Sequence, residues 1–530
     1  MDWSTATKLV NSKLSIPIDQ HFKLCAGPGA GKTTFLIHHI RRILTYSTRL
    51  SKSRRIACIT YTNTGVETIR SRLKDTGEDI EISTIHSFLY THVVKPYLWL
   101  LNDISFPLDR LEGHDEIKPS YTTLKEYKQR TSQFWIKDDQ GLSNALSKLS
   151  WVINKQEEVE LGFLKPYHGK VEERFIKKNS YLTYKEICWE QGMMSHDDVL
   201  YFSYLILKKH EKVKEIIRAK FPYFLIDEFQ DTSPIQVAIT TLLAEKEITV
   251  GVIGDPSQSI YSFQGANGKT FSQFNIKGMS FYILENNHRS TIQIISVLNH
   301  MRNDKHFIQH SPDNKVGNKP VILIGDVFSS YRYFLENVKN DWCVLSYKNE
   351  VTNRIKYDIR DIVTTDFDLF YRDNKRGRLI YFVVHALEYG RQMKLKDAIK
   401  YMKKAYRSIE DFTDQDAFRN LKRLLNNYED YYSNNIKDFY NTHIFNYYGV
   451  KSKITKGEIS EYYENLGFDR LAAIVNIADD KSFHKTIHKA KGDEFKNVLV
   501  ISSENNYNKQ LDFLLSPDMS KEEHRVFYVV

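Results

Sequence analysis

The amino-acid sequence predicts an α/β protein with two parallel-sheet cores, each carrying a mostly helical insertion. Short apolar runs rich in β-branched or aromatic residues recur along the chain, and most are followed by a loop and then by a helical pattern. This alternation is typical of buried parallel strands connected by helices. The expected strands are Phe22–Cys25, Ile56–Thr60, Tyr223–Ile226, Ile248–Ile253, Phe281–Leu284, Val321–Ile324, Trp342–Ser346 and Val498–Ser502.

Two long segments interrupt the strand pattern, and both have the charge and periodicity of helical insertions. We therefore expect a first core in two parts, 1–89 and 196–290, around an insertion at 90–195. A second core is expected in parts 291–349 and 481–530, around an insertion at 350–480 that is rich in lysine and tyrosine.

Length and composition leave several classes of function open. The 530 residues are enough for more than one domain, and the net charge of +9 permits a polyanionic partner without requiring one. Tyrosines among lysines, at 401–406 and 428–448, fit either nucleic-acid stacking or amphipathic helices. The four cysteines lie far apart without metal-site spacing, so we expect reduced thiols. No segment has the roughly 18 apolar residues of a membrane span, so a soluble, cytoplasmic protein is expected.

A glycine-rich loop follows the first expected strand and precedes a helical pattern. In this order the backbone N–H groups and the helix N-terminus can surround phosphates. Lys32 would reach the β- and γ-phosphates, and Thr33 would offer its hydroxyl to Mg²⁺. The predicted phosphate-binding residues are Ala26, Gly27, Pro28, Gly29, Ala30, Gly31, Lys32, Thr33 and Thr34.

An adjacent pair of acids, Asp227 and Glu228, follows the expected strand Tyr223–Ile226. The strand would deliver Asp227 to its carboxyl end, where the carboxylate can hold Mg²⁺ together with Thr33. Glu228 is then placed to take a proton from an attacking water. The acid pair therefore favours hydrolysis of a nucleoside triphosphate over a small-molecule kinase, which would need a hydroxyl pocket and a lid.

Two further strand ends carry polar residues suited to a γ-phosphate. Gln258 lies in the loop after Ile248–Ile253, and Arg289 lies in the loop after Phe281–Leu284. A glutamine amide can contact both the phosphate and its attacking water, and a guanidinium can stabilise the negative charge that develops there. We expect Lys32, Asp227, Glu228, Gln258 and Arg289 to be the catalytic residues.

With this loop, acid pair and polar strand ends, the chain resembles a superfamily 1 DNA helicase of the UvrD, Rep and PcrA type. Further segments match motifs of that family in the family's order, over both cores but not in the residues of the two insertions. These segments are Thr60–Asn63, Thr84–Phe88, Asp197–Leu200, Cys343–Tyr347, Thr486–Phe495 and Glu522–Val529.

The resemblance implies two RecA-like cores that bind ATP and Mg²⁺ between them, with single-stranded DNA, or a duplex with a 3′ overhang, as the partner. It implies that Gln258 and Arg289 sense or stabilise the γ-phosphate, and that Gly492 and Glu494 approach the nucleotide from the second core. It also implies 3′-to-5′ movement. The positions at which the family contacts DNA are Tyr61, Thr62, Asn63, His86, Tyr261, Phe263 and His488.

Two simpler roles remain open for these DNA positions. The aromatic side chains of Tyr61 and Phe263 could pack in the core. The imidazoles of His86 and His488 could hold their loops through hydrogen bonds.

Three positions depart from the family pattern. Ala6 and Thr7 stand where the family has its adenine-binding glutamine, although Gln20 is near the loop, so the preference for ATP over other triphosphates is open. His288 replaces a tyrosine that stacks on the base, and offers a smaller ring area. The chain ends at Val530, before the arginine of the last motif, so we expect a fragment of a longer protein rather than a natural short form.

Two functions follow from this sequence. The first is an ATP-dependent DNA helicase or single-stranded DNA translocase. The alternative is a regulatory nucleotide- and DNA-binding subunit that acts with a partner nuclease in DNA repair or anti-phage defence, since the chain carries no nuclease motif of its own. An RNA helicase is less favoured, because no motif here is specific for a 2′-hydroxyl.

Overall fold

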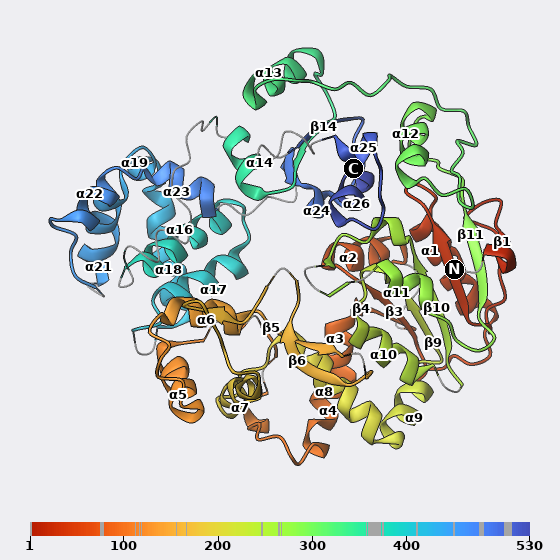
Figure 1. Cartoon of the computed structure of the whole chain (residues 1–530), viewed down its shortest axis with the longest axis horizontal. Coiled ribbons are helices and arrows are strands. Elements are labelled where there is room, and N and C mark those ends of the chain that lie inside the picture. Colours follow the sequence, from red (N-terminus) through yellow and green to blue (C-terminus); the bar gives the residue numbers. More distant parts are fainter. Residues whose placement is uncertain are drawn as a thin grey trace. The chain divides into compact units, whose positions relative to one another are not determined.

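The computed structural model of the chain (Figure 1) forms two compact units, residues 1–320 with 512–529 and residues 321–511. Each unit is described by itself. The described residues are 3–74, 79–111, 113–115, 117, 119–154, 156–165, 167–244, 247–262, 265–266, 268–356, 358, 373, 376–409, 412–448, 451–475, 482–502 and 511–530.

A seven-stranded, all-parallel sheet lies at the centre of the first unit, in the order β1-β11-β2-β10-β9-β3-β4. The five strands expected in the first core are confirmed to within one residue at their ends. The sequence analysis missed β1, which has two residues, and β4, which is only partly buried at the sheet edge. The strands are β1 (Thr7–Lys8), β2 (Phe22–Ala26), β3 (Ile56–Thr60), β4 (Ile80–Thr84), β9 (Tyr223–Ile226), β10 (Thr249–Gly254) and β11 (Ser280–Leu284).

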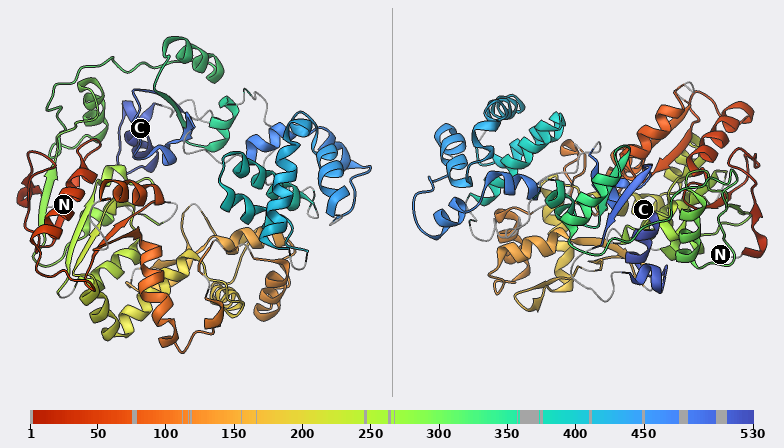
Figure 2. Two further views of the ribbon diagram at one scale, coloured as in Figure 1. Left: turned by 180° about the vertical axis from the view of Figure 1, so that it is seen from behind. Right: turned by 90° about the horizontal axis from the view of Figure 1, so that it is seen from above.

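Helices cover both faces of this sheet (Figures 1 and 2). Successive side chains of a strand point to opposite faces, so a buried strand contributes to two cores. In β9, Leu225 packs with helices α1 (Lys32–Tyr46) and α2 (Asn63–Arg72), whereas Phe224 packs with α8 (His196–Lys209) and α10 (Pro234–Leu243) on the other face. This packing explains why the strands are apolar at every position.

The insertion in the first unit is more varied than the mostly helical segment that we expected. Besides helices it contains two antiparallel ribbons, β5–β6 and β7–β8. Helix α3 (Ile85–Leu89) follows the sheet strand β4 and continues into the insertion as a π-helical turn, Tyr90–Val94. The other elements of the insertion are α4 (Lys95–Tyr97), α5 (Tyr121–Thr131), α6 (Asp139–Ser147), β5 (Leu149–Ile153), β6 (Val159–Phe163), β7 (Lys170–Val171), β8 (Arg174–Phe175) and α7 (Tyr181–Glu190). Helix α9 (Glu211–Lys220) follows α8 in the second part of the first core.

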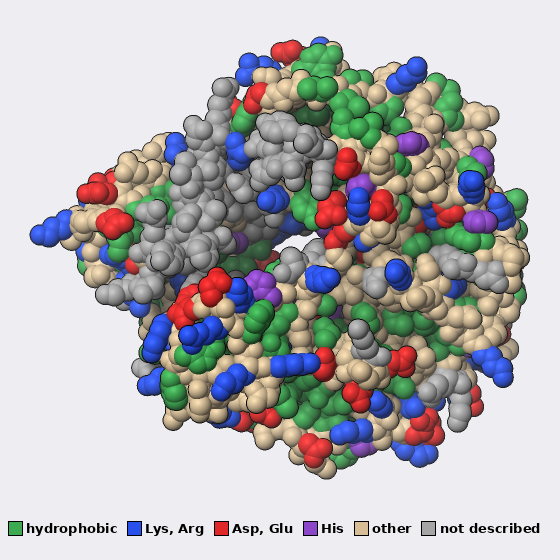
Figure 3. Space-filling model, in the orientation of Figure 1, with side chains coloured by type: hydrophobic (Ala, Val, Ile, Leu, Met, Phe, Trp, Pro, Cys, Tyr) green, Lys and Arg blue, Asp and Glu red, His purple; other side chains and the backbone are tan. Residues whose placement is uncertain are grey.

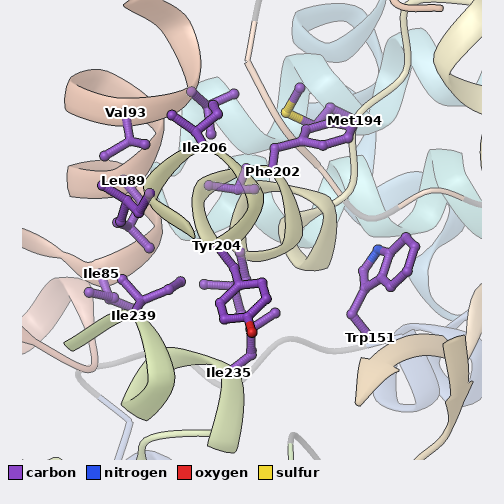
Figure 4. Packing of buried hydrophobic residues seen from close by; sticks show 14 of the residues in the cluster. Ile85, Leu89, Val93, Trp151, Met194, Phe202, Tyr204, Ile206, Ile235 and Ile239 are labelled. Atoms are coloured by element: carbon purple, nitrogen blue, oxygen red, sulfur yellow. The ribbon is translucent and has the colours of Figure 1, made fainter. Parts of the chain in front are cut away.

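One continuous apolar cluster joins this insertion to the sheet (Figure 4). Val93 and Trp151 of the insertion lie in the same cluster as Phe202 of α8 and Ile239 of α10, and all four side chains are buried. Burial of a side chain of this size contributes about 1.5–3 kcal/mol to folding. The insertion is therefore packed firmly on the core that carries the phosphate loop.

The second unit has a small parallel sheet and a separate helical core. The sheet has the order β13-β12-β14, and two of its strands were expected. Its elements are β12 (Trp342–Ser346), β13 (His484–Thr486), β14 (Asn497–Ile501), α13 (Val327–Asn337), α14 (Asn349–Lys356) and α24 (Ile487–Ala490). The helical core consists of α16 (Gly377–Arg391), α17 (Leu395–Ala405), α18 (Asp414–Asn426), α19 (Tyr428–Tyr432), α20 (Ile436–Phe439), α21 (Asn446–Tyr448), α22 (Glu458–Glu464) and α23 (Phe468–Val475).

The expected strand Val321–Ile324 is wrong. These residues have no regular secondary structure, and the side chains of Val321 and Ile324 are 76% and 93% exposed. A strand needs hydrogen-bonding neighbours as well as apolar residues, and no described strand pairs with this segment. The apolar pattern alone could not reveal this.

The compact units differ from the expected cores at two places. Helices α12 (Ile292–Arg302) and α26 (Glu522–Val529) belong to the first unit, where they contact each other, although the sequence analysis placed both segments in the second core. The division of the chain into six segments stays a prediction.

Candidate nucleotide and nucleic-acid site

The glycine-rich loop forms the connection between β2 and α1 at the carboxyl edge of the sheet. Gly29 (φ 66°) and Gly31 (φ 82°) have left-handed backbone conformations, which glycine adopts at little steric cost. Gly31 is the N-cap of α1, and no side chain caps this helix of 15 residues. The helix N-terminus, with Lys32, Thr33 and Thr34 in its first turn, is thus suited to bind an anion.

The buried amide side chains of Gln309 and Asn287 pack against the glycine-rich loop. The Nε2 of Gln309 donates to the Pro28 carbonyl at 2.9 Å, and a Cβ atom on Gly27 would clash with the same amide. A Cβ atom on Gly29 would clash with Asn287, and the neighbouring His288 N–H donates to the Gly29 carbonyl at 3.0 Å. At Gly29, close packing and the left-handed backbone conformation both disfavour a side chain.

The Lys32 ammonium lies between the loop and the end of β10. It donates to the Ala26 carbonyl and to Gln258 Oε1, each at 3.3 Å. The structure thus brings together two of the expected catalytic residues, which are 226 positions apart in the sequence.

The acid pair lies at the carboxyl end of β9, as expected. Asp227 is buried, and its Oδ1 accepts the Glu228 N–H at 3.0 Å. Glu228 has a φ of 53°, a left-handed conformation that is unfavourable for a residue with a side chain. Such a backbone conformation persists only where the surrounding structure enforces it, and it is concentrated at functional sites.

A chain of hydrogen bonds links the acid pair to Lys32. The Gln230 side chain donates to the Glu228 carboxylate, and its Oε1 accepts the Asp255 N–H at 3.0 Å. The Asp255 carboxylate in turn accepts the Gln258 amide N–H at 2.8 Å. The sequence analysis assigned no role to Gln230 or Asp255, although both lie inside the segments from which Glu228 and Gln258 were chosen.

Thr33 and Asp227 were expected to hold Mg²⁺. Thr33 follows β2 and Asp227 follows β9, and these two strands flank β10 at the same edge of the sheet. A hydroxyl and a carboxylate are the hard oxygen ligands that Mg²⁺ prefers, and a magnesium site commonly takes few ligands from the protein. The residues present fit this ion.

Arg289 and His288 are exposed beside the loop. The β-carbon of Arg289 lies close to Gly29, and the Arg289 N–H donates to Asn287 at 3.0 Å. His288 Nδ1 lies 3.8 Å from a carboxylate oxygen of Asp313. Both residues are close enough to the loop to be candidates for nucleotide contacts, and their roles stay predictions.

Tyr61 and Tyr261 form an aromatic pair beyond the ends of β3 and β10. Their ring centroids lie 4.7 Å apart at an interplanar angle of 36°. Burial, with Asp231 and Tyr261 nearby, raises the pKa of the Tyr61 hydroxyl, so the side chain stays neutral. Phe263, expected on the same surface, lies outside the described residues.

Thr62 and Asn63 begin helix α2. The Thr62 hydroxyl caps this helix by accepting the Gly65 N–H at 3.0 Å. Asn63 is the first helical residue and is exposed. The structure thus shows a capping role for Thr62, and a contact of either residue with DNA stays a prediction.

His86 lies in a cluster of three histidines that the sequence analysis did not foresee. His114 Nδ1 and His196 Nδ1 are 2.6 Å apart, and the His86 ring centroid is 5.9 Å from that of His196. Burial and the neighbouring imidazoles lower the pKa of both His86 and His114 to about 4. These two side chains are therefore neutral at pH 7.

Three expected site residues belong to the second unit. The ring centroids of His488 and Tyr347 lie 5.5 Å apart, in an edge-to-face arrangement. Gly492 has a φ of 95°, and Glu494 is exposed. Between them, Asp493 forms an ion pair with Lys485 at 2.7 Å, which holds the turn that carries them.

The segment Asp197–Leu200 is structural. Asp198 is buried at the start of α8, where it accepts the Ser195 N–H in a capping box. The Asp198 carboxylate also pairs with Lys185 at 2.9 Å and accepts the indole N–H of Trp151 at 3.0 Å. This arrangement satisfies the charge of a carboxylate that has no access to solvent.

The parallel sheet, the phosphate loop at its carboxyl edge and the acid pair two strands away define a RecA-like core of the P-loop type. The family model of the UvrD/REP helicase N-terminal domain matches residues 10–277, about half of the chain. The chain therefore belongs to the UvrD/REP helicase family.

Curated relatives carry helicase names. DNA helicase II of Haemophilus influenzae is 25% identical over 436 residues, which cover 77% of this chain and 54% of that protein. DNA helicase II of Escherichia coli is 26% identical over 422 residues, covering 74% and 53%. The ATP-dependent DNA helicase PcrA of Bacillus subtilis is 26% identical over 282 residues, covering 52% and 36%. The chain spans about half the length of the two DNA helicase II proteins.

Among the helices that the structure describes, none combines the length and apolarity that crossing a bilayer would require.

Proposed function

We propose that this chain is an ATP hydrolase of the DNA-helicase type, which couples hydrolysis to movement along single-stranded DNA in the 3′-to-5′ direction. The observation that carries the proposal is the continuous series of hydrogen bonds from Lys32 through Gln258, Asp255 and Gln230 to Glu228. It links the predicted phosphate contacts to the predicted general base within one sheet edge.

In this proposal the loop from Ala26 to Thr34 binds the phosphates through its N–H groups, and Lys32 contacts the β- and γ-phosphates. Thr33 and Asp227 hold Mg²⁺, which neutralises charge on the phosphates when it is bound. Glu228 accepts a proton from the attacking water, and Gln258 orients that water. Arg289 stabilises the charge on the γ-phosphate, as a guanidinium does in related enzymes.

Further nucleotide contacts belong to the same proposal. His288 lies beside the loop and stacks on the nucleotide base. Gly492 and Glu494, in the second unit, contact the nucleotide from the other core.

Single-stranded DNA is the proposed partner because an aromatic pair is present at positions that such proteins use for stacking. Tyr61, which is partly exposed, would offer a ring face to any base, and Tyr261, which is buried against it, would support that ring. Thr62, Asn63, His86, Phe263 and His488 complete the proposed contact set. On the face shown in Figure 3, lysine and arginine side chains lie among acidic ones. Base stacking would supply the preference for single strands.

The two DNA helicase II proteins and PcrA are named as helicases, which favours the helicase over the regulatory alternative. We therefore expect ATP hydrolysis to be stimulated by single-stranded DNA in the absence of any partner protein.

The first test measures the rate of ATP hydrolysis with and without single-stranded DNA. Lys32→Ala should abolish nucleotide binding, whereas Glu228→Gln should retain binding and lower kcat by roughly 10²–10⁴-fold, because only proton transfer is lost. The exposed lysine variant Lys212→Ala is the matched control and should behave as wild type. Unchanged hydrolysis in both site variants would contradict the proposal.

The second test measures DNA affinity by fluorescence anisotropy with a labelled oligonucleotide. Tyr61→Ala should weaken binding by about 1–3 kcal/mol, the contribution of one stacked base. Tyr121→Ala, which alters a 69% exposed tyrosine of α5, is the control. Equal affinities of the two variants would show that Tyr61 is a packing residue.

A further inference from the structure

Arg302, the last residue of α12, is a buried cation that the proposed mechanism does not use. Its side chain is 3% exposed, and its Nη1 donates to both oxygens of Asp255 at 2.9 and 3.1 Å. The guanidinium also lies over the Phe307 ring, 3.7 Å from the centroid. A charge at this depth is costly unless it is paired, so Arg302 and Asp255 depend on each other.

The pairing determines which way the Gln258 amide points. An ionised carboxylate only accepts hydrogen bonds, so Asp255 Oδ2 must face the amide nitrogen of Gln258. The amide oxygen is then directed toward Lys32, as the 3.3 Å contact shows. Without the Arg302 guanidinium, Asp255 would no longer be held in place by its two hydrogen bonds, and the Gln258 amide would lose its fixed acceptor.

The same guanidinium reaches helix α26. Its Nη1 donates to the Tyr528 hydroxyl at 3.2 Å, and Tyr528 is fully buried. Two other residues of α26 contact the loop that follows Asp255: Glu522 accepts the Ser262 N–H at 2.9 Å, and Arg525 donates to the Ser259 carbonyl. Helix α26 therefore contacts both the buried Arg302 and the loop that carries Gln258.

We propose that Arg302 is a positioning residue of the nucleotide site. It holds Asp255 as the acceptor that orients the Gln258 amide, and it connects α26 to this carboxylate through Tyr528. The inference rests on the proposed ATP hydrolysis, because Gln258 acts only there.

The experiment compares two buried arginines. Arg302→Met removes the pairing cation, and Arg218→Met is the matched control, because Arg218 is also 3% exposed and bonds the Leu242 and Leu243 carbonyls away from the site. Both variants should lose stability. Only Arg302→Met should lower kcat, by roughly 10²-fold, with little change in KM, since the phosphate loop is intact.

Two further variants separate positioning from general damage. In a Gln258→Ala background, Arg302→Met should cause no further loss of kcat, because Arg302 acts through Gln258. Tyr528→Phe removes only the hydroxyl that Arg302 contacts, so this variant should still fold. Because α26 loses that contact, its amide hydrogens should exchange about tenfold faster than those of α26 in Arg218→Met.

The outcomes are distinguishable. Absence of ATP hydrolysis in the wild type would contradict the proposed function, and the exchange rates of α26 would still decide whether Arg302 holds that helix. Equal kcat in the two arginine variants, or losses that multiply in the Gln258→Ala background, would overturn the inference. Unchanged exchange in Tyr528→Phe would overturn the connection to α26.

Discussion

At the scale of single residues, the histidine cluster shows how burial determines protonation. His86 and His114 have a pKa of about 4, because burial and adjacent imidazoles disfavour the cationic form. An unfolded chain restores the ordinary pKa of about 6.5. Between these two values the unfolded chain binds more protons than the folded protein, so acid favours unfolding there.

We expect the contribution of these two histidines to the free energy of unfolding to be constant above about pH 6.5 and to fall as the pH decreases toward 4. Replacement of the partly buried His86 by Asn should flatten this dependence by on the order of 2 kcal/mol, measured by urea unfolding at pH 7.5 and 4.5. The exposed residue His168 gives the control variant His168→Asn, which should keep the wild-type slope. Identical slopes in the two variants would show that His86 is not the titrating group.

Some residues of the candidate site could be predicted from the sequence because their signal is local. Lys32 and Asp227 each follow an apolar strand at a fixed spacing, and the structure places both at the carboxyl edge of one sheet. Arg302 and Gln309 gave no such signal. Each acts on a residue far away in the sequence, and no local pattern specifies that partner.

At the scale of elements, the start of α8 illustrates how the charge on a buried helix end is compensated by a paired cation and hydrogen bonds. Burial raises the pKa of the Asp198 carboxyl, but Lys185 and the hydrogen bonds from Trp151 and Ser195 lower it by more, so the side chain stays ionised. The carboxylate caps the helix and neutralises Lys185 at the same time. The acidic segment Asp197–Leu200 thus stabilises the fold rather than forming part of the nucleotide site.

Lys185→Met should destabilise the first unit by about 3–5 kcal/mol, because it leaves a buried carboxylate without its cation. The double variant Lys185→Met/Asp198→Asn should recover part of this loss, since no isolated charge remains. Urea unfolding followed by tryptophan fluorescence measures both, because Trp151 contacts Asp198 directly. A loss no larger than that of Lys212→Met, which breaks an exposed ion pair, would contradict the expectation.

At the scale of the whole molecule, two units with separate cores imply that unfolding need not be a single transition. The cysteines are convenient reporters, because all four are buried thiols. Cys25, Cys58 and Cys188 lie in the first unit and Cys343 lies in the second. Burial raises the pKa of Cys25 and Cys188 to about 12 and that of Cys343 to about 11.

Since the thiolate is the reactive form, we expect none of the four cysteines to react with a disulfide reagent at pH 8 in the native protein. Pulsed labelling across a urea series, with mass spectrometry of the peptides, should label Cys343 at a different urea concentration from the other three. Simultaneous labelling of all four would show that the units unfold together. Rapid labelling without urea would contradict their burial.

The sequence by itself determined the phosphate loop, the acid pair and the parallel strands of the first core. Each of these depends on neighbouring residues: glycines that allow a left-handed backbone, and apolar runs that a two-sided sheet requires. Only the tertiary structure decided that Arg302 pairs with Asp255, that three histidines meet at His86, and that Val321–Ile324 forms no strand. These features depend on which distant segments pack together, and that follows from the free energy of the whole fold rather than from any local pattern.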